Sequence, residues 1–382
     1  MRICRIALTP ITKIYELFPQ RDYHLLFRLR AFGHEIHEVR ITPAWRPAMP
    51  SVAYLAALLK AIPRLVFIKA DLILADGLEA AVIAWMIARI KRVPFVFDYR
   101  DHYSFLYRQR RGWRNLRIIQ FLERWLPRIA DLVITVDGRC TTACIEAGVR
   151  MDRIRVVSNG TDLQLFTPGP KDQQLLARWG LSGRQVILYV GKITPSFNLP
   201  MVLEAMREVV QRYPQACLLI VGDGTALSEL KRLCLELGLM RHVVFTGCRP
   251  YSEIPALIRS SDVCVYPLRS VAALAIFEYM ACGRPVVVPN ADYDLSLPDG
   301  SCLPVDKSSQ GFAGGISYLL SDPAFADKIG RKARTVVEAH FNWDRLALTY
   351  EAALQGVVKD QASSCRAKGG SSHLVDDDRN GY

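Results

Sequence analysis

The chain has 382 residues, of which 51% are hydrophobic and 23% are charged. This balance is typical of globular proteins and excludes a collagen-like or wholly disordered chain, and the length predicts two domains. No run of about 18 uncharged apolar residues occurs, so we expect neither a spanning helix nor a signal peptide. The ten cysteines form no Cys-x-x-Cys pair, which favours free thiols in a reducing cytoplasm.

The basic excess lies in the N-terminal part of the chain. Residues 1–160 contain 26 Lys and Arg against 14 Asp and Glu, whereas the rest contains 23 of each. A basic half favours an anionic partner, and nucleic acid, a membrane surface and an acidic ligand all fit.

The first 160 residues alternate strands with helices, which predicts a parallel sheet. The periodicity predicts strands at 5–9, 35–41, 70–75, 94–98, 132–136 and 154–157 and helices at 23–32, 79–90, 116–129 and 140–147. A turn-rich break at 158–162 precedes a second series of the same kind. Its expected strands are 186–191, 216–221, 243–245, 263–266 and 285–288, and its expected helices are 200–213, 226–237, 251–259 and 274–282.

We therefore predict an α/β protein with two Rossmann-like domains facing a cleft. The predicted domains are 1–165 and 166–340. A further helix is predicted at 341–357, and the Ser, Gly and Asp-rich residues 358–382 predict a disordered tail.

Two strand ends in the second half suit an anionic ligand. Val221-Gly222-Asp223-Gly224 closes a strand and opens a helix, where glycines admit a ligand to the backbone and helix amides favour negative charge. A tight turn that binds no ligand would explain the same residues. Gly191 and Lys192 form a similar turn. The ammonium group of Lys192 would either bind a diphosphate or remain solvated in a loop.

Glu278 lies within the short apolar helix of the segment 277–287, between two buried strands. An ionised carboxylate is costly there without a partner. A sugar or ribose diol would supply hydrogen bonds, and an ion pair with Arg284 is the alternative.

The segment 277–287 resembles the donor-binding helix of the retaining glycosyltransferases of family 4, which have the GT-B fold. Further blocks of that family are matched in order by Asn159-Gly160-Thr161-Asp162 with Phe166 and Pro168, Val190-Gly191-Lys192, Ile220 to Gly224, Val244 to Gly247, Ser261-Asp262-Val263 with Tyr266-Pro267, and Phe341-Asn342-Trp343. The resemblance implies a UDP- or GDP-linked sugar as donor substrate, without a cofactor, and we expect no metal. It also implies that 1–165 binds the acceptor, that 166–340 binds the nucleotide sugar and that the helix at 341–357 is a crossover helix. Its implied donor-binding residues are Gly191, Lys192, Gly222, Asp223, Gly224, Arg249, Ser270, Ala273, Leu274 and Glu278.

Three charged positions of the family are changed in this chain. Ser270 stands where the first of two glutamates is usual, Phe197 where a phosphate-binding lysine is usual, and Ala275 where some subgroups carry a lysine. Donor phosphates would then rest on Lys192, on backbone amides near 272–275 and on Arg269.

Asp101 and His102 are the acceptor-side candidates. They follow the strand 94–98, and the resemblance implies that a polar residue here contacts the transferred sugar. We therefore predict Asp101, His102 and Lys192 as catalytic residues. Helix capping is the alternative role of Asp101.

A basic-aromatic tract predicts contact with an anionic membrane. It combines Arg100, Arg108, Arg110, Arg111, Arg114 and Arg117 with Tyr103, Phe105, Tyr107 and Trp113, and the stretch 54–69 is a second basic-apolar segment. The alternatives are single-stranded nucleic acid, which we do not expect, and a solvated helix face. We predict a cytoplasmic protein, and the tract adds peripheral attachment to the inner face of the cell membrane.

The predicted function is transfer of a sugar to an acceptor in cell-surface polysaccharide or glycolipid synthesis. The resemblance implies that the sugar is a hexose, and a lipid-linked molecule is one acceptor that fits. A catalytically impaired homologue that binds nucleotide or a partner protein is the first alternative, because of Ser270, Phe197 and Ala275. A nucleotide-sugar epimerase or hydrolase on the same fold is the second, and a dinucleotide dehydrogenase is the third.

Overall fold

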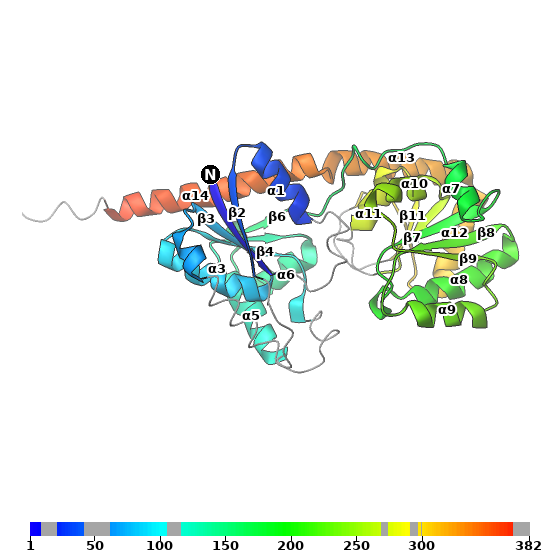
Figure 1. The fold of residues 1–382 in the computed structure, drawn as a ribbon, viewed down its shortest axis with the longest axis horizontal. Helices are drawn as coiled ribbons and strands as arrows, with labels where there is room; N and C mark the ends of the chain where they lie inside the picture. Colours follow the sequence, from blue (N-terminus) through cyan, green and yellow to red (C-terminus); the bar gives the residue numbers. More distant parts are fainter. Residues whose placement is uncertain are drawn as a thin grey trace, which may run out of the picture. The chain divides into compact units, whose positions relative to one another are not determined.

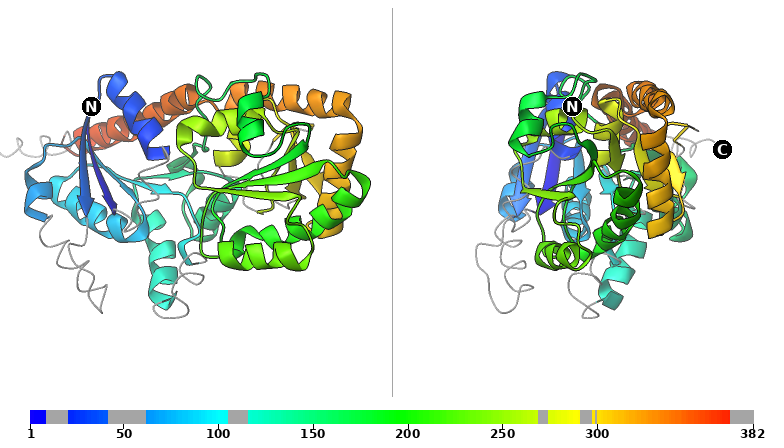
Figure 2. Two further views of the ribbon diagram at one scale, coloured as in Figure 1. Left: turned by 45° about the vertical axis from the view of Figure 1, so that its right-hand side comes forward. Right: turned by 90° about the vertical axis from the view of Figure 1, so that its right-hand side faces the viewer.

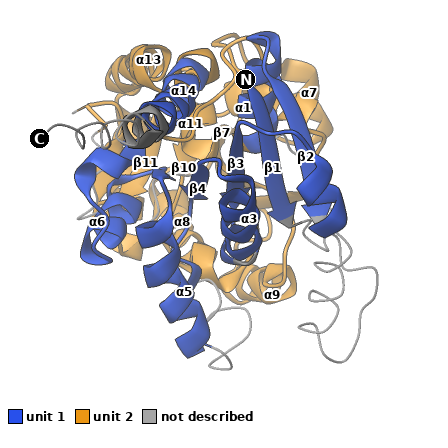
Figure 3. Ribbon diagram, turned by 90° about the vertical axis from the view of Figure 1, so that its left-hand side faces the viewer, with its two compact units in different colours: residues 1–15, 22–157, 347–382 blue, residues 16–21, 158–346 orange. Residues whose placement is uncertain are grey.

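The computed structural model describes residues 1–8, 21–41, 62–104, 116–268, 274–290, 297–298 and 300–369. They form two compact units (Figure 3). Unit 1 comprises the described residues up to Val157, apart from Arg21, together with the residues from Ala347 on. Unit 2 comprises Arg21 and Ser158–Leu346.

Unit 1 is built on a parallel sheet with the strand order β2-β1-β3-β4-β5-β6. Its strands are β1 (Arg2–Leu8), β2 (Glu35–Ile41), β3 (Leu72–Asp76), β4 (Phe95–Tyr99), β5 (Leu132–Thr135) and β6 (Ile154–Val156). Its helices are α1 (Arg21–Ala31), α3 (Leu78–Lys91), α5 (Leu116–Ile129) and α6 (Gly138–Glu146). Helices α3 and α5 lie on one face of the sheet and α1 on the other (Figure 1). The central strands are continuous apolar runs because helices cover both faces.

Unit 2 repeats this plan with the parallel order β12-β11-β10-β7-β8-β9. Its strands are β7 (Gln185–Val190), β8 (Ala216–Val221), β9 (Val243–Gly247), β10 (Val263–Val265), β11 (Val286–Pro289) and β12 (Leu303–Val305). Its helices are α7 (Gln173–Arg178), α8 (Leu199–Arg212), α9 (Leu227–Glu236), α10 (Ile254–Arg259), α11 (Leu274–Ala281), α12 (Ser309–Ser321) and α13 (Pro323–His340). Figure 2 shows helices on both sides of this sheet.

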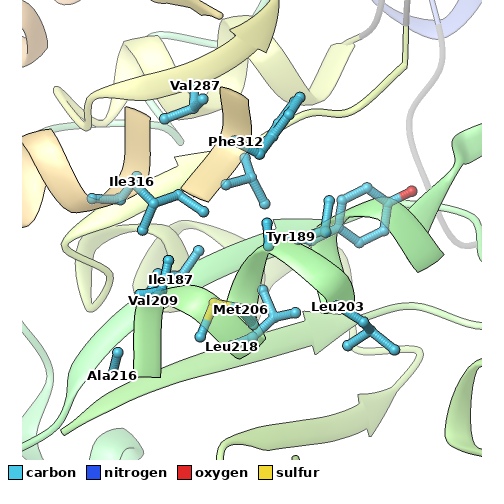
Figure 4. Close-up of a cluster of buried hydrophobic side chains, with 14 of the residues drawn as sticks. Ile187, Tyr189, Leu203, Met206, Val209, Ala216, Leu218, Val287, Phe312 and Ile316 are labelled. Atoms are coloured by element: carbon cyan, nitrogen blue, oxygen red, sulfur yellow. The ribbon is translucent and has the colours of Figure 1, made fainter. Parts of the chain in front are cut away.

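Strand β7 divides the core of unit 2 because successive side chains of a strand point to opposite faces. Ile187 and Tyr189 enter one hydrophobic cluster, with helices α8 and α12 (Figure 4). Val186 and Leu188 enter the other, which contains the apolar side chains of α10 and α11.

The structure confirms the α/β class and the two Rossmann-like domains, and it moves their limits. The division falls between Val157 and Ser158, before the predicted 165, and helix α14 (Trp343–Gly369) begins in unit 2 and continues in unit 1. The prediction of disorder from 358 is therefore wrong as far as Gly369. Leu354 is buried and Gln361 Nε2 donates to the Arg92 carbonyl, so the helix is held by contacts that its polar composition does not reveal. The predicted tail beyond 369 lies outside the described residues.

Helix α12 was not predicted because its three glycines disfavour a helix. Ser308 caps it by accepting a hydrogen bond from Gly311 N at 3.0 Å. Gly315 is needed for packing, since a Cβ there would lie 2.6 Å from Val305 Cγ1. Helices α7 and α13 and strand β12 were also not predicted. None of the described helices is long and apolar enough to cross a membrane.

Candidate functional site

The loops after β7, β8 and β9 are joined to one another at the carboxyl ends of the strands. Gly191 N donates to the Val221 carbonyl and Gly222 N donates to the Gly247 carbonyl, each at 3.0 Å. Ile193 N donates to the Asp223 carbonyl at 2.9 Å. Three strand ends therefore form one continuous rim, the edge at which open α/β sheets bind their ligands.

The two glycines of the Gly222-Asp223-Gly224 turn are required by this contact between loops. A Cβ on Gly222 would lie 1.9 Å from the Gly191 carbonyl oxygen, and one on Gly224 would lie 2.1 Å from the Ile193 carbonyl oxygen. The sequence left two explanations for these glycines, the approach of a ligand and a tight turn without a ligand. Close packing of one loop on the next requires them whether or not a ligand binds.

Lys192 and Asp223 bring opposite charges to this rim. Both side chains are exposed. The buried Tyr189 hydroxyl donates to the Lys192 carbonyl at 2.8 Å, which fixes the backbone from which the lysine projects. An exposed ammonium on a fixed backbone can interact with an anionic ligand, and only its side chain remains to be ordered on binding.

Glu278 is buried on α11, with 6% of its surface exposed. The Tyr251 hydroxyl donates to Glu278 Oε1 at 2.7 Å. Burial raises the pKa of the Glu278 carboxyl to about 7, and the hydrogen bond from Tyr251 opposes this shift. A carboxyl group held this way is half ionised near neutral pH and can accept hydrogen bonds from a diol.

The alternative ion pair between Glu278 and Arg284 is wrong. Arg284 Nη2 donates to the main-chain carbonyls of Gly169, at 3.1 Å, and of Arg259. It therefore ties the start of unit 2 to the end of α10. Among the described residues, the polar contact of the Glu278 carboxyl group is the hydrogen bond from the Tyr251 hydroxyl.

Tyr279 is a site residue that the sequence analysis missed. Its buried hydroxyl accepts from Val190 N at 2.6 Å and donates to the Val190 carbonyl at 3.3 Å. This contact fixes α11 to the end of β7, so Glu278 and the Gly191-Lys192 turn share one rigid support. Its position next to Glu278 in an apolar helix gave no signal of a polar role.

Arg249 follows β9 and is held in place on two sides. Its guanidinium makes a bidentate pair with Glu253, with contacts of 2.8 to 3.0 Å. It also lies over the Trp179 ring, 5.6 Å from the centroid. The donor-binding role of Arg249 stays a prediction. The structure shows that Glu253 and Trp179 already hold its guanidinium group in place.

Of the three family positions that are changed in this chain, the structure describes Phe197 and Ala275. Phe197 packs edge-on against the rings of Tyr189 and Tyr266, each at 6.4 Å, so it is part of an aromatic cluster. Leu274 and Ala275 begin α11 and are half-buried. Arg269, Ser270 and Ala273 lie outside the described residues.

The acceptor-side candidates follow β4 in unit 1. Asp101 is exposed and His102 is half-buried, its ring 6.3 Å from that of Tyr99. Glu123 accepts from the Tyr99 hydroxyl at 2.8 Å and from Ser104 N at 3.3 Å, which holds both ends of this segment. The predicted catalytic roles of Asp101 and His102 stay predictions.

Arg100 is not available to a membrane, which corrects its place in the basic-aromatic tract. Its guanidinium pairs with Asp98 at 2.8 Å, with Asp76 at 3.1 Å and with Asp22. Burial disfavours its charge, but the three carboxylates outweigh burial and raise its pKa. Buried charges need such partners. Tyr103 of the tract is also turned inward, since its hydroxyl accepts from Gly77 N. The tract residues 105–115 and the stretch 54–61 lie outside the described residues.

Comparison with known proteins follows the division into two halves. Residues 16–165 match the model "Glycosyltransferase Family 4" and residues 173–336 match the model "Glycosyl transferases group 1". The chain belongs to the family 4 glycosyltransferases. This confirms the resemblance drawn from the sequence blocks.

Two sequence relatives and one solved structure are similar to this chain. A GDP-mannose-dependent phosphatidylinositol monomannoside mannosyltransferase of Mycolicibacterium smegmatis is 28% identical, over 61% of this chain and 64% of its own length. The sulfoquinovosyl transferase SQD2 of Arabidopsis thaliana is 27% identical, over 72% of this chain and 54% of its own. The crystal structure of Anabaena HepE with UDP-glucose superposes with a TM-score of 0.73 at 23% identity, covering 93% of this chain and all of that one.

In this glycosyltransferase, no group of three or more His, Cys, Asp or Glu side chains that could hold a metal occurs among the residues that the structure describes.

Proposed function

We propose that this protein transfers a hexosyl group from a nucleotide sugar to an acceptor with retention of configuration, and that unit 2 binds the donor. The observation that carries the proposal is the buried Glu278 carboxyl group, which is held by Tyr251 and fixed through Tyr279 to the strand end that bears Lys192. Membership of the glycosyltransferase family supports the reaction class.

The proposed mechanism assigns a role to each part of the rim. Glu278 accepts hydrogen bonds from the ribose hydroxyls of the donor. Lys192 stabilises the negative charge that develops on the departing diphosphate, and the amides at the start of α11 add to this effect. Because Phe197 replaces a phosphate-binding lysine, Lys192 carries more of this charge stabilisation. Asp101 and His102 contact the transferred sugar.

The acceptor of the proposed reaction is a lipid-linked molecule, and the donor carries UDP or GDP. One relative supports the first point, since its name specifies a phosphatidylinositol monomannoside acceptor. The donor base is supported by a UDP-glucose complex of one fold relative and by the GDP-mannose dependence of a sequence relative. Peripheral contact with an anionic membrane belongs to the same proposal.

An assay with a panel of donors tests this function. Purified protein is incubated with UDP-, GDP- and ADP-sugars, and nucleotide release is followed with and without a membrane lipid extract. Release that requires the extract supports the transferase and identifies its donor. Release without any acceptor favours a hydrolase, and conversion of the donor sugar without release of nucleotide favours an epimerase.

A catalytically impaired homologue is the second candidate, and Phe197 is the observation that favours it. This side chain is packed between Tyr189 and Tyr266 and offers no charge to a phosphate. Donor binding without turnover under every condition of the panel would support this candidate.

A further inference from the structure

The outward sides of α3 and α5 in unit 1 carry large apolar side chains. Met86 and Ile90 of α3 are 47% and 62% exposed, and Ile118 and Phe121 of α5 are 58% and 61% exposed. Phe67, in the helical turn 62–67, is 84% exposed. Single exposed apolar residues are common, but several on neighbouring helices indicate a binding surface. We call these five residues the α3–α5 surface.

The two helices of this surface pack against each other (Figure 3). The Trp85 ring of α3 meets the Trp125 ring of α5 edge-on at 5.1 Å, and Phe121 stacks on Trp125 at 6.1 Å. Lys91 Nζ donates to the carbonyls of Val66 and Ile68, each at 2.6 Å, which holds the turn bearing Phe67 at the end of α3.

The helical spacing places the apolar residues in rows. Met86 and Ile90 are four positions apart, and Ile118, Phe121 and Trp125 follow one another at intervals of three and four. Residues so spaced share one side of a helix.

The charge around this surface is basic. The exposed charged side chains of the turn 62–67 and its exit, of α3 and of α5 are Arg64, Lys69, Arg89, Arg117, Arg124 and Arg128. Glu123 is the one acid of α5, and it faces the sheet because it accepts from the buried Tyr99 hydroxyl. In the part of these elements whose side chains the structure describes, no exposed acid offsets the basic residues.

We propose that the α3–α5 surface docks onto an anionic lipid bilayer. Apolar and aromatic side chains enter the interface between headgroups and acyl chains, while the surrounding arginines pair with lipid phosphates. This deepens the proposed function, on which it rests for a lipid-linked acceptor. The surface takes the place of the predicted tract, in which Arg100 is half-buried and paired with three carboxylates, and it keeps Arg117 of that tract.

Two other occupants fit the chemistry less well. A second copy of the chain, docking by twofold symmetry, would bring the arginines of both copies together, and like charges across an interface oppose association. Single-stranded nucleic acid stacks on aromatic rings, but it offers no apolar contact to the aliphatic Met86, Ile90 and Ile118.

Sedimentation with vesicles tests the proposal. The full chain is mixed with vesicles of phosphatidylcholine, with and without phosphatidylglycerol. The test variants are Ile118→Ser with Phe121→Ser, and Arg117→Gln with Arg124→Gln. The matched control is Leu235→Ser with Met240→Ser, two residues of unit 2 that are 66% and 56% exposed.

We expect binding to the phosphatidylglycerol vesicles only, weakening as salt rises. Loss of the two arginines should weaken it on the order of 30-fold, and the apolar pair should weaken it at least about 10-fold. The control should bind like the wild type. Equal binding by all variants, or no vesicle binding by the wild type, would overturn the proposal. So would a wild-type dimer that the Ile118→Ser, Phe121→Ser variant disperses.

Calorimetric titration with nucleotide separates this outcome from the proposed function. Vesicle binding is measured without a donor, and donor binding is measured without vesicles. The two test variants should bind nucleotide like the wild type, because their changes lie in unit 1. Normal vesicle binding by a protein that binds no nucleotide would contradict the proposed function and leave the docking surface supported.

Discussion

The Tyr251 hydroxyl donates a hydrogen bond of 2.7 Å to Oε1 of the buried Glu278 carboxyl group. Burial raises the pKa of Glu278 from its ordinary 4.5 to about 7. Without a ligand, Tyr251 supplies a hydrogen bond that stabilises the ionised form. A ribose diol that adds further hydrogen bonds would favour the carboxylate more strongly.

The free energy of unfolding should fall as the pH rises from about 4.5 to about 7, because the folded protein holds a proton on Glu278 that the unfolded chain has released. The loss is about 2 to 4 kcal/mol and levels off above the raised pKa. In Glu278→Gln this contribution is absent. Urea unfolding of both proteins at pH 5 and pH 8 measures the difference, and an identical pH dependence would contradict the raised pKa.

Replacement of Tyr251 by Phe removes the hydrogen bond that favours the Glu278 carboxylate. The pKa of Glu278 should rise further, and stability at pH 8 should fall by about 1 to 3 kcal/mol, because a buried carboxylate loses its donor. Carboxyl NMR follows the titration directly. Tyr213→Phe, which loses a 3.2 Å hydrogen bond to the Ser317 carbonyl, is the matched control and should leave the Glu278 pKa unchanged.

Glu278→Ala should weaken nucleotide binding at least about 10-fold, the equivalent of one charge-assisted hydrogen bond. Glu253 is a poor control because it holds Arg249. Glu236 is better, since it is half exposed and pairs with Arg232 on α9. Calorimetric titration with UDP and GDP measures the effect. Equal affinity of Glu278→Ala and Glu236→Ala would sink the assignment of the donor site.

The elements that could be predicted from sequence are those with a local signal. Strand β8 and helix α5 have the predicted bounds because each is a strongly apolar or amphipathic run between turn residues. Glu278 was found because a carboxylate in an apolar helix is conspicuous. Its partner Tyr251 is 27 positions away, and only the fold brings the two together.

Other features depend on contacts that no local pattern contains. Arg100 read as a solvent-facing residue of a basic tract, but carboxylates from α1, β3 and β4 surround it. An ion pair with Glu278 was the alternative for Arg284, which instead donates to two backbone carbonyls. Helix α12 forms despite its glycines because Gly315 fits against β12.

Gly222→Ala should destabilise unit 2 by roughly 3 kcal/mol or more. The new Cβ would lie 1.9 Å from the Gly191 carbonyl oxygen, and Gly222 has a φ of 146°. Gly314→Ala is the control, since it lies in α12 with nothing within 4 Å of its Cβ, and it should be neutral or stabilising by up to about 1 kcal/mol. Thermal unfolding compares them, and equal stability of the two variants would refute the close contact between the loops.

Arg100→Met should destabilise unit 1 by about 3 to 5 kcal/mol at pH 7, because the buried Asp98 loses the Arg100 guanidinium and the half-buried Asp22 and Asp76 keep only that of Arg5. Burial already raises the pKa of Asp76, and loss of Arg100 removes an opposing charge, so its pKa should rise further. The folded variant then takes up protons as the pH falls, and its deficit relative to the wild type should shrink toward pH 5.

Arg2→Met is the control for this change, because Arg2 is 42% exposed and pairs with Asp71 at the surface, where an ion pair contributes about 1 kcal/mol or less. Urea unfolding at pH 5 and pH 7 measures both variants. Nucleotide affinity of Arg100→Met should remain at the wild-type level, because the donor residues lie in unit 2. A deficit no larger than that of Arg2→Met, or one that grows as the pH falls, would show that Arg100 does not neutralise these carboxylates.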